Sequence, residues 1–388
     1  MDYINRGIAG RTACGVDSRI TTKLGGWGRV RLALAALLVV LPPAAAQNGE
    51  IVAWGSNGWG QCNVPAPNAE FVAISAFWCV SMGLRADGTL AMWGSNASGQ
   101  CDVPAPNADF IGGAVGGSHC LAVKSDGTVV AWGYNANGQC NVPAPNADFV
   151  AVAAGTNHSL GLKSDGSIVA WGANHAGQCN VPGPNNYVAI AGGYAHSLGL
   201  RADGTIAAWG SNNYGETTVP APNADFVAIA ACWRHSLGLR ADGSIAAFGS
   251  NNYGQGNVPP PNDDFIAIAA GAEFSLGVKA DGSVVGWGYN AQGQCNPPAP
   301  NTNFVAVAGG ELHSLALKHP AVVIGDLNCD GAVNFGDINA FVLYLSNFPA
   351  WQTVYRWCPA ENGDINEDGT YPSFGDINPF VTLLTTTP

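Results

Sequence analysis

The sequence predicts an all-β propeller with seven blades, closed by strands from the two ends of a repeat region and followed by a small α-helical domain. Three observations lead to this fold class. One segment of about 39 residues recurs seven times, the two ends of the array complete each other, and the composition changes abruptly after residue 320. We therefore divide the chain into residues 1–46, 47–320 and 321–388.

The repeat is recognised by a Trp-Gly pair near the middle of each copy. This pair begins at Trp54, Trp93, Trp132, Trp171, Trp209 and Trp287, with Phe248 in the remaining copy. A period of this size is typical of solenoids, propellers and arrays, because one unit cannot bury its apolar face alone. Charged residues make up only 11% of the chain, beside 52 Gly and 24 Pro, which favours short strands and tight turns over helices.

Within each copy, apolar runs of four to seven residues alternate with clusters of Gly, Pro, Asn and Asp, the pattern of strands and turns. An Asp-Gly pair stands between two of these runs and supplies the positive φ angles of a tight hairpin. The Asp residues of these pairs are Asp87, Asp126, Asp165, Asp203, Asp242 and Asp281. We interpret them as turn residues rather than as a functional ring of carboxylates.

The two ends of the array fit together. The seventh copy stops at residues 318–320, where its Asp-Gly turn and next strand should follow, and the equivalents of these missing parts stand at residues 48–54. The first strand can therefore pair with the last copy and close a ring. An open solenoid would need capping repeats instead.

Residues 1–46 have the pattern of a secretory signal. Arg29 and Arg31 precede an apolar stretch at residues 32–41, and small residues follow up to Ala46. We expect cleavage after Ala46 and a secreted or cell-surface protein. A retained membrane anchor is the alternative, which the short apolar stretch disfavours, and we expect no stable membrane span.

Without residues 1–46, nine basic and 25 acidic residues remain, a net charge of −16. Such a surface repels nucleic acid and anionic membranes, and it contains no basic stripe. We therefore expect no nucleic-acid partner.

Two columns of chemically reactive residues recur at fixed positions of the repeat. The cysteine column is Cys62, Cys101, Cys140, Cys179 and Cys295, and the histidine column is His119, His158, His196, His235 and His313. Equivalent positions of successive blades are too far apart for disulfides, so we interpret the cysteines as small buried residues. For the histidines, hydrogen bonds within their own blade are favoured over a ring of metal ligands.

The motif elements Gly-x-x-His-Ser, Asp-Gly and Trp-Gly-x-Asn-x-x-Gly-Gln cover residues 47 to about 320. In these elements the repeat resembles the regulator of chromosome condensation family. The resemblance implies a seven-bladed propeller. It does not imply one function, because members of the family include a nuclear nucleotide-exchange factor, a plant ultraviolet photoreceptor and a secreted β-lactamase inhibitor.

Positions that vary between copies are candidates for ligand binding, because loops on a rigid scaffold carry recognition and large aromatic or charged side chains there make good anchors. Ordinary drift between copies is the alternative. The repeats contain no catalytic motif, and we single out no catalytic residue. The candidate ligand-binding residues are Trp59, Trp78, Tyr194, Tyr214, Trp233, Arg234, Tyr253, Glu273 and Glu311.

The C-terminal region contains two loops with oxygen ligands at the spacing that wraps Ca²⁺. We expect two Ca²⁺ sites. The acid that closes the second loop comes one residue late, so this loop bulges or binds Ca²⁺ more weakly. The ligands of the first loop are Asp326, Asn328, Asp330, the carbonyl of Ala332, and Asp337. Those of the second are Asp364, Asn366, Asp368, Thr370 and Asp376.

Apolar residues at helical spacing follow each loop, at residues 335–342 and 374–381, and no helix precedes it. This doubled half-motif resembles a type I dockerin, which implies docking onto a cohesin module. Phe335-Gly336 and Phe374-Gly375 occupy positions where dockerins often carry small hydroxyl residues, so the partner is a cohesin-like protein or another cell-envelope component. Cys329 and Cys358 are the only cysteines of this region, and export permits a disulfide between them.

Two function classes follow. The first is a secreted or surface-attached binding protein, whose propeller recognises a protein or glycan and whose tail docks in a calcium-dependent way. The second is an extracellular enzyme acting on polysaccharide, since dockerins often accompany such enzymes. Nucleotide exchange by the propeller is a third possibility, which export opposes.

Overall fold

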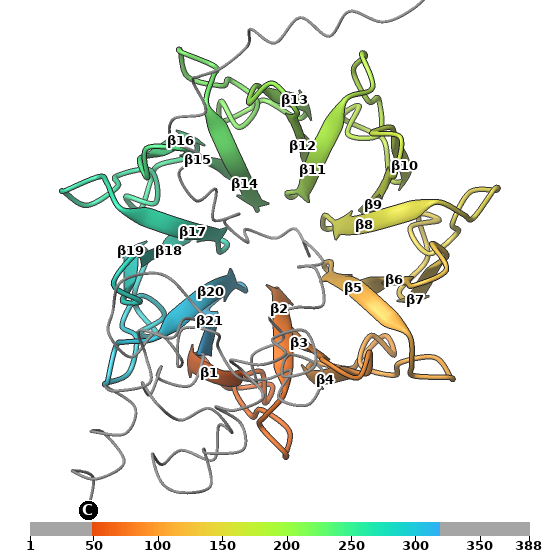
Figure 1. Cartoon of the computed structure of the whole chain (residues 1–388), viewed down its shortest axis with the longest axis horizontal. Coiled ribbons are helices and arrows are strands. Elements are labelled where there is room, and N and C mark those ends of the chain that lie inside the picture. Colours follow the sequence, from red (N-terminus) through yellow and green to blue (C-terminus); the bar gives the residue numbers. More distant parts are fainter. Residues whose placement is uncertain (1–48, 319–388) are drawn as a thin grey trace, which may run out of the picture. The chain divides into compact units, whose positions relative to one another are not determined.

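In a computed structural model, which describes residues 49–318, the repeats form seven three-stranded antiparallel sheets arranged as a ring (Figure 1). Each sheet is one blade, with an inner, a middle and an outer strand. The inner strands are β2 (Phe71–Phe77), β5 (Phe110–Val115), β8 (Phe149–Ala154), β11 (Tyr187–Gly192), β14 (Phe226–Cys232), β17 (Phe265–Ala270) and β20 (Phe304–Gly309).

The middle strands are β3 (Val80–Arg85), β6 (His119–Lys124), β9 (His158–Lys163), β12 (His196–Arg201), β15 (His235–Arg240), β18 (Phe274–Lys279) and β21 (His313–Lys318). The outer strands are β4 (Leu90–Gly94), β7 (Val129–Gly133), β10 (Ile168–Gly172), β13 (Ile206–Gly210), β16 (Ile245–Gly249), β19 (Val284–Gly288) and β1 (Glu50–Gly55). Blades 1 to 6 begin with β2, β5, β8, β11, β14 and β17, and blade 7 combines β20, β21 and β1.

The ring closes as predicted. β1 pairs antiparallel with β21, with Ile51 opposite Leu317 and Trp54 opposite Ser314 (Figure 1). The inner strand β2 contacts both β5 and β20, and every other inner strand likewise contacts its two neighbours. Small residues at the ends of the inner strands line a narrow central channel.

The core lies within and between the blades. Each inner strand begins with a buried aromatic residue, and in every inner strand except β2 most of the later residues are buried. The ring of Phe149 needs the space above the middle strand, because a Cβ on Gly161 would lie 2.4 Å from it. This close approach explains the glycine in the middle strand of most copies.

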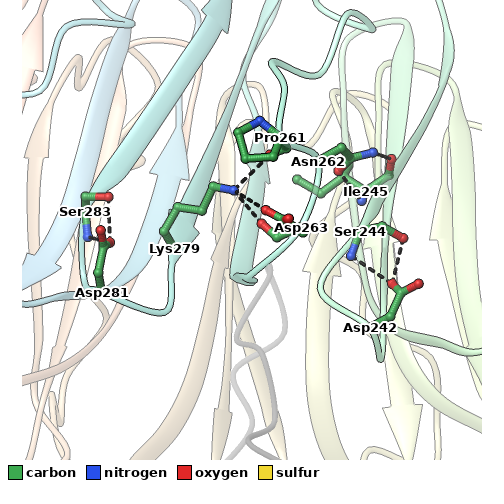
Figure 2. Close-up of polar contacts among 9 residues, drawn as sticks. All are labelled: Asp242, Ser244, Ile245, Pro261, Asn262, Asp263, Lys279, Asp281 and Ser283. Atoms are coloured by element: carbon green, nitrogen blue, oxygen red, sulfur yellow. Dashed lines mark hydrogen bonds and ion pairs between the residues drawn. The ribbon is translucent and has the colours of Figure 1, made fainter.

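The Asp-Gly hairpins differ in detail from the prediction. Only the glycine has a positive φ, as at Gly243 with φ 82°. The bond from the nitrogen of Arg240 to the carbonyl of Ser244 encloses three loop residues, 241–243, rather than two. The Asp side chain instead accepts two hydrogen bonds from the residue two positions later. In Figure 2, Asp242 Oδ1 accepts from the backbone nitrogen and the hydroxyl of Ser244, and Asp281 does the same with Ser283.

The open edge of most outer strands is covered by an asparagine side chain. Asn262 accepts a hydrogen bond from the nitrogen of Ile245 and donates one to its carbonyl, so the amide acts as a short fourth strand (Figure 2). The same pair of bonds is made by Asn68, Asn107, Asn146, Asn223 and Asn301.

Neighbouring blades are joined by a repeated set of buried hydrogen bonds. Nε2 of His158 lies 2.9 Å from the hydroxyl of Ser197 in the next blade, and that hydroxyl donates to the carbonyl of Gln178. Because Ser197 has only one proton to donate, Nε2 of His158 is the donor in their bond. The indole of Trp209 donates to the same carbonyl of Gln178.

The histidine prediction is therefore corrected: these side chains join successive blades rather than bonding within their own. The partners of His119, His196, His235 and His313 are Ser159, Ser236, Ser275 and Ser81, the last across the seam. Burial lowers the pKa of His119, His158 and His235 to about 3 and that of His196 and His313 to about 4. All five are neutral at physiological pH.

One interface replaces both partners together. Val80 takes the histidine position in blade 1, and Cys120 takes the serine position in blade 2, where both lie in one apolar cluster. Val80 needs no hydrogen-bond partner, and the thiol of Cys120 donates to the carbonyl of Gln100 at 3.4 Å, so the exchange leaves neither side chain without a partner that it needs. The joint replacement of the histidine and the serine at this interface indicates that the two residues act together in joining blades.

The cysteine column is partly buried, and its thiols are free. Each thiol donates to a backbone carbonyl of its own loop, as Cys62 does to Ser56 at 3.2 Å. Burial raises the pKa of Cys62, Cys101, Cys140 and Cys179 to about 11 and that of Cys295 to about 12. These thiols are therefore protonated and serve the loop structure.

Candidate functional site

One end of the channel gathers two kinds of loop from every blade. The turn between the inner and middle strands lies against the loop that follows the outer strand, since the nitrogen of Tyr134 donates to the carbonyl of Ser118 at 2.8 Å. Equivalent bonds, such as Ser95 to Cys79 and Ser250 to Arg234, recur around the ring. We call this end the channel mouth.

A belt of backbone hydrogen bonds links the turns of successive blades at the mouth. In five blades, the nitrogen of the first turn residue donates to the turn of the next blade. The donors are Gly117, Thr156, Tyr194, Ala272 and Glu311. Blades 1 and 5 break this pattern, because their first turn residues are Trp78 and Trp233, with φ angles of 44° and 40°.

The two tryptophan turns are locally strained. A bulky residue with positive φ is an outlier, and the left-handed conformation costs about 1–2 kcal/mol. Both tryptophan carbonyls accept a hydrogen bond from a backbone nitrogen of the preceding blade. The donor to Trp78 is Glu311, and the donor to Trp233 is Tyr194. Among the described residues, neither tryptophan nitrogen continues the belt to the following blade. Strain of this kind is concentrated at functional sites.

The two tryptophans meet although blades 1 and 5 are not neighbours. Their ring centroids are 6.4 Å apart, and the ring of Tyr194 from blade 4 lies 5.0 Å from that of Trp233. Arg234 joins this group, with its guanidinium carbon 4.6 Å from the ring centroid of Tyr214. It also lies over Tyr194 at 5.9 Å and over Trp233 at 5.6 Å. We call Trp78, Trp233, Tyr194, Tyr214 and Arg234 the mouth cluster.

Arg234 differs from every other basic residue of the described region. The other seven lie at the ends of the middle strands, each over the aromatic ring that begins the inner strand of its own blade. Of the eight basic residues among 49–318, Arg234 alone lies at the mouth, and its side chain has no hydrogen-bond acceptor within the described part of the chain.

Two acidic side chains complete the mouth. Burial raises the pKa of Glu273. The positive charge of Arg234 acts in the opposite direction, and the negative charge of Glu311 raises this pKa further. Glu311 also accepts a hydrogen bond from the thiol of Cys79 at 3.6 Å. The mouth therefore combines aromatic faces, one cation and two partly buried carboxylates.

A pocket of about 330 Å³ opens beside the first tryptophan turn and is lined by residues of blades 7, 1 and 2. Trp59, Trp78, Cys79, Ser98 and Glu311 are among the residues that line it, and the side chain of Trp59 is 64% exposed. The pocket contains no basic residue.

The structure thus brings eight of the nine predicted ligand-binding residues into contact with, or close to, the mouth cluster. The ninth, Tyr253, also lies in a mouth loop, the one after β16, but there it packs against Tyr289, with the ring centroids 5.2 Å apart. Sequence reasoning missed Tyr289 and the role of Cys79. The signal for Cys79 was available, because Trp78-Cys79 and Trp233-Arg234 occupy the same two positions of the repeat.

Several other predictions lie outside the described residues. These are the signal at residues 1–46, the two calcium loops, the disulfide between Cys329 and Cys358, and the dockerin-like helices. Within residues 49–318, no helix has the length and apolar character needed to cross a bilayer. In the same range, no group of His, Cys, Asp and Glu is arranged to hold a metal ion.

Comparison with known proteins supports the repeat type. Five segments match the regulator of chromosome condensation (RCC1) repeat, at residues 111–139, 149–178, 187–216, 226–255 and 265–294. These segments fall in blades 2 to 6 and the loops that follow them. No curated protein matches the chain in sequence.

Solved structures with the same fold are distant in sequence. Prp20p from Saccharomyces cerevisiae is 18% identical, with a TM-score of 0.62 over 72% of this chain and 93% of its own. A structure of Kap60 bound to yeast RCC1 (Prp20) is 17% identical, with a TM-score of 0.61 over 80% of this chain and 96% of its own. The ectodomain of the Arabidopsis thaliana receptor kinase ACR4 is 22% identical, with a TM-score of 0.52 over 62% of this chain and 90% of its own. Residues 49–318 are thus a seven-bladed propeller, in which blades 2 to 6 carry RCC1-type repeats.

Proposed function

We propose that the propeller is a binding module that recognises a macromolecule, a protein or a glycan, through the mouth cluster. One observation carries this proposal: Trp78, Trp233 and Arg234 converge at the channel mouth in two strained turns, whereas the other five blades form the same turn without strain and without these side chains. The scaffold does not need these side chains. Trp, Tyr and Arg are the residue types that contribute most to binding energy at interfaces.

The structural relatives favour a protein as the macromolecule. The structure of Prp20p is described together with its binding to Gsp1p and histones, and in the second structure Kap60 is bound to yeast RCC1. A rigid ring that presents variable loops suits the same kind of task here. The identity of the partner is a separate question from the fold.

The test is capture of a partner from the cell envelope by the full chain. Asn tolerates positive φ, so Trp233→Asn preserves the turn while removing the indole. We expect this variant, and Arg234→Gln, to lose the captured partner. Tyr134→Ser removes an exposed aromatic side chain outside the cluster and serves as the control. Equal capture by all variants would contradict the proposal.

For the C-terminal region we propose calcium binding and docking onto a cohesin-like or other cell-envelope partner after export. The support is the doubled ligand pattern that begins at Asp326 and Asp364. Calorimetric titration with Ca²⁺ should give two binding events, and Asp326→Ala and Asp364→Ala should each remove one. A heat signal that neither variant changes would overturn the calcium proposal.

Cleavage of a polysaccharide is the second candidate. The observation in its favour is the raised pKa of Glu273, which lies near a second carboxylate, Glu311, since a general acid needs such a shift. Screening of glycans for turnover separates the candidates. Cleavage that Glu273→Gln abolishes would favour the enzyme, and binding without turnover would favour the binding module.

A further inference from the structure

The two tryptophan turns belong to two quasi-equivalent sites, one in front of blade 1 and one in front of blade 5. The same repeat positions surround both turns. Trp59 of the first site corresponds to Tyr214 of the second, Trp78 to Trp233, and Glu311 to Tyr194. The backbone hydrogen bonds agree with this correspondence. The backbone nitrogen of Glu311 donates to the carbonyl of Trp78, and that of Tyr194 donates to the carbonyl of Trp233.

The decisive difference is the residue after each tryptophan. At the second site this residue is Arg234, whose guanidinium lies among the rings of Tyr214, Trp233 and Tyr194. At the first site it is Cys79, whose side chain is too short to reach the equivalent place. The pocket of about 330 Å³ opens there. The chain therefore fills one aromatic site with its own cation and leaves the other open.

The open site has the chemistry of a receptor for a cation. Trp59 and Trp78 supply aromatic faces, and Trp is the best aromatic partner for a cation. Glu311 adds a carboxylate where the second site has only the neutral Tyr194, and no basic residue lines the pocket. The described region also contains 17 acidic and eight basic side chains, which attracts a basic partner.

From this correspondence we infer that the pocket of Trp59, Trp78, Cys79 and Glu311 binds a basic side chain, an arginine or lysine, presented by a protein partner. The inference rests on the proposed binding function and names the chemistry that its partner must carry. The occupant takes the place that Arg234 takes at the second site. Its charge is met by the carboxylate of Glu311, and its apolar stem by the rings of Trp59 and Trp78.

The direct test compares two short peptides with the full chain. Acetyl-Gly-Arg-Gly-amide carries the cation, and the same peptide with citrulline in place of arginine is its neutral isostere. Binding is followed by the NMR shifts of the indole N–H groups of Trp59 and Trp78. We expect the arginine peptide to bind at least about tenfold more tightly than the citrulline peptide.

Variants of the chain make the test specific. Cys79→Arg copies the second site, so the introduced guanidinium should fill the pocket and abolish peptide binding. Tyr134→Arg adds the same charge at an exposed position outside the pocket and should leave binding unchanged. Arg234→Cys copies the first site and should add a second binding event. Glu311→Gln should weaken binding of the arginine peptide by about tenfold. Because blade 5 already holds arginine in this turn, the fold should tolerate Cys79→Arg, and an unchanged melting temperature checks this.

Three outcomes would overturn the inference. They are equal binding of the arginine and citrulline peptides, undiminished binding by Cys79→Arg, and indole shifts caused by a neutral saccharide but not by the arginine peptide. Failure here is distinguishable from failure of the proposed function. If Trp233→Asn abolishes partner capture while the pocket fails to bind the arginine peptide, the proposed binding function holds and only this inference is wrong.

Discussion

Single buried side chains hold two blades together in this ring, and His158 illustrates how. It is fully buried and donates to Ser197 of the next blade, and taking up a proton would create a charge in a site from which water is excluded. Because four other histidines occupy the same position, the effect of one residue is multiplied around the ring.

The first prediction is a steep loss of stability in mild acid. The five interface histidines have folded pKa values of about 3 or 4, against an ordinary 6.5. Below about pH 6.5 the unfolded chain binds protons at these positions and the folded chain does not, so the free energy of unfolding falls as the pH drops towards about 4. Urea midpoints measured between pH 7 and pH 4.5 should fall continuously.

A matched pair of variants assigns this slope to the interfaces. His235→Val combined with Ser275→Cys copies the natural Val80 and Cys120 pair and should make the pH dependence shallower. The exposed His175, changed to Asn, should leave it as it is. An identical slope in all three proteins would contradict the assignment.

The second prediction concerns the one interface that lacks an indole. In blade 5, Phe248 stands where the other blades have tryptophan, so the carbonyl of Glu216 accepts only the hydroxyl of Ser236. Phe248→Trp should add one buried hydrogen bond and raise the free energy of unfolding by about 1 kcal/mol. Trp171→Phe, which removes the bond to Gln139, should lower it by a similar amount. Chemical denaturation measures both, and a destabilised Phe248→Trp would show that the space is too small.

At the scale of the elements, the blades have three strands, and an asparagine amide covers the outer edge of most of them. This substitution for a fourth strand explains how a repeat of about 39 residues, rich in Gly and Pro, forms a blade without leaving a long open edge. Blade 3 differs, because the loop after its outer strand β10 is one residue shorter and the equivalent Asn185 is exposed.

The third prediction follows from these amides. Asn146→Ala removes two hydrogen bonds to Val129 and should lower the free energy of unfolding by about 1–2 kcal/mol. Asn185→Ala should have almost no effect, which makes it the matched control. Thermal melts of the two variants decide the point, and equal losses would show that the amides contribute nothing special.

Periodicity was sufficient to predict the blades and the closure of the ring, because each strand is short, apolar and bounded by turn residues. It was not sufficient for the contacts between blades. The bond from His158 to Ser197 joins residues 39 positions apart, and nothing in one copy indicates which copy supplies the partner. The meeting of Trp78 with Trp233 depends on the curvature of the whole ring, so the sequence indicated both residues as candidates without placing them together.

At the scale of the whole molecule, blade 7, which is closed by the pairing of β1 with β21, is joined to its neighbours by the same bonds as most other blades. The indole of Trp54 donates to the carbonyl of Gln294 in the loop after blade 6, and His313 bonds Ser81 of blade 1. The blade that closes the ring is therefore bonded to its neighbours as the other blades are, and we expect the ring to unfold as one unit.

The fourth prediction tests this cooperativity. Ile51 in β1 is almost completely buried, and Ile51→Asp places an unpaired carboxylate in the seam, at a cost of about 3–5 kcal/mol. Hydrogen exchange should then accelerate throughout the ring, including β8 and β9, which lie far from the seam. The exposed Glu50, changed to Gln, is the control. Faster exchange confined to blade 7 would contradict cooperative unfolding.

The position of β1 also determines how long after its own translation the strand can pair. The hydrogen-bonding partner of this strand, β21, is among the last parts of the propeller to be translated. At a synthesis rate of about 5–20 residues per second, roughly 15–50 s pass before the partner exists. During that interval the first strand, with Ile51 and Trp54, has an unpaired edge and exposed apolar side chains. We expect a chaperone or a low concentration of nascent chains to be needed to prevent aggregation through this strand.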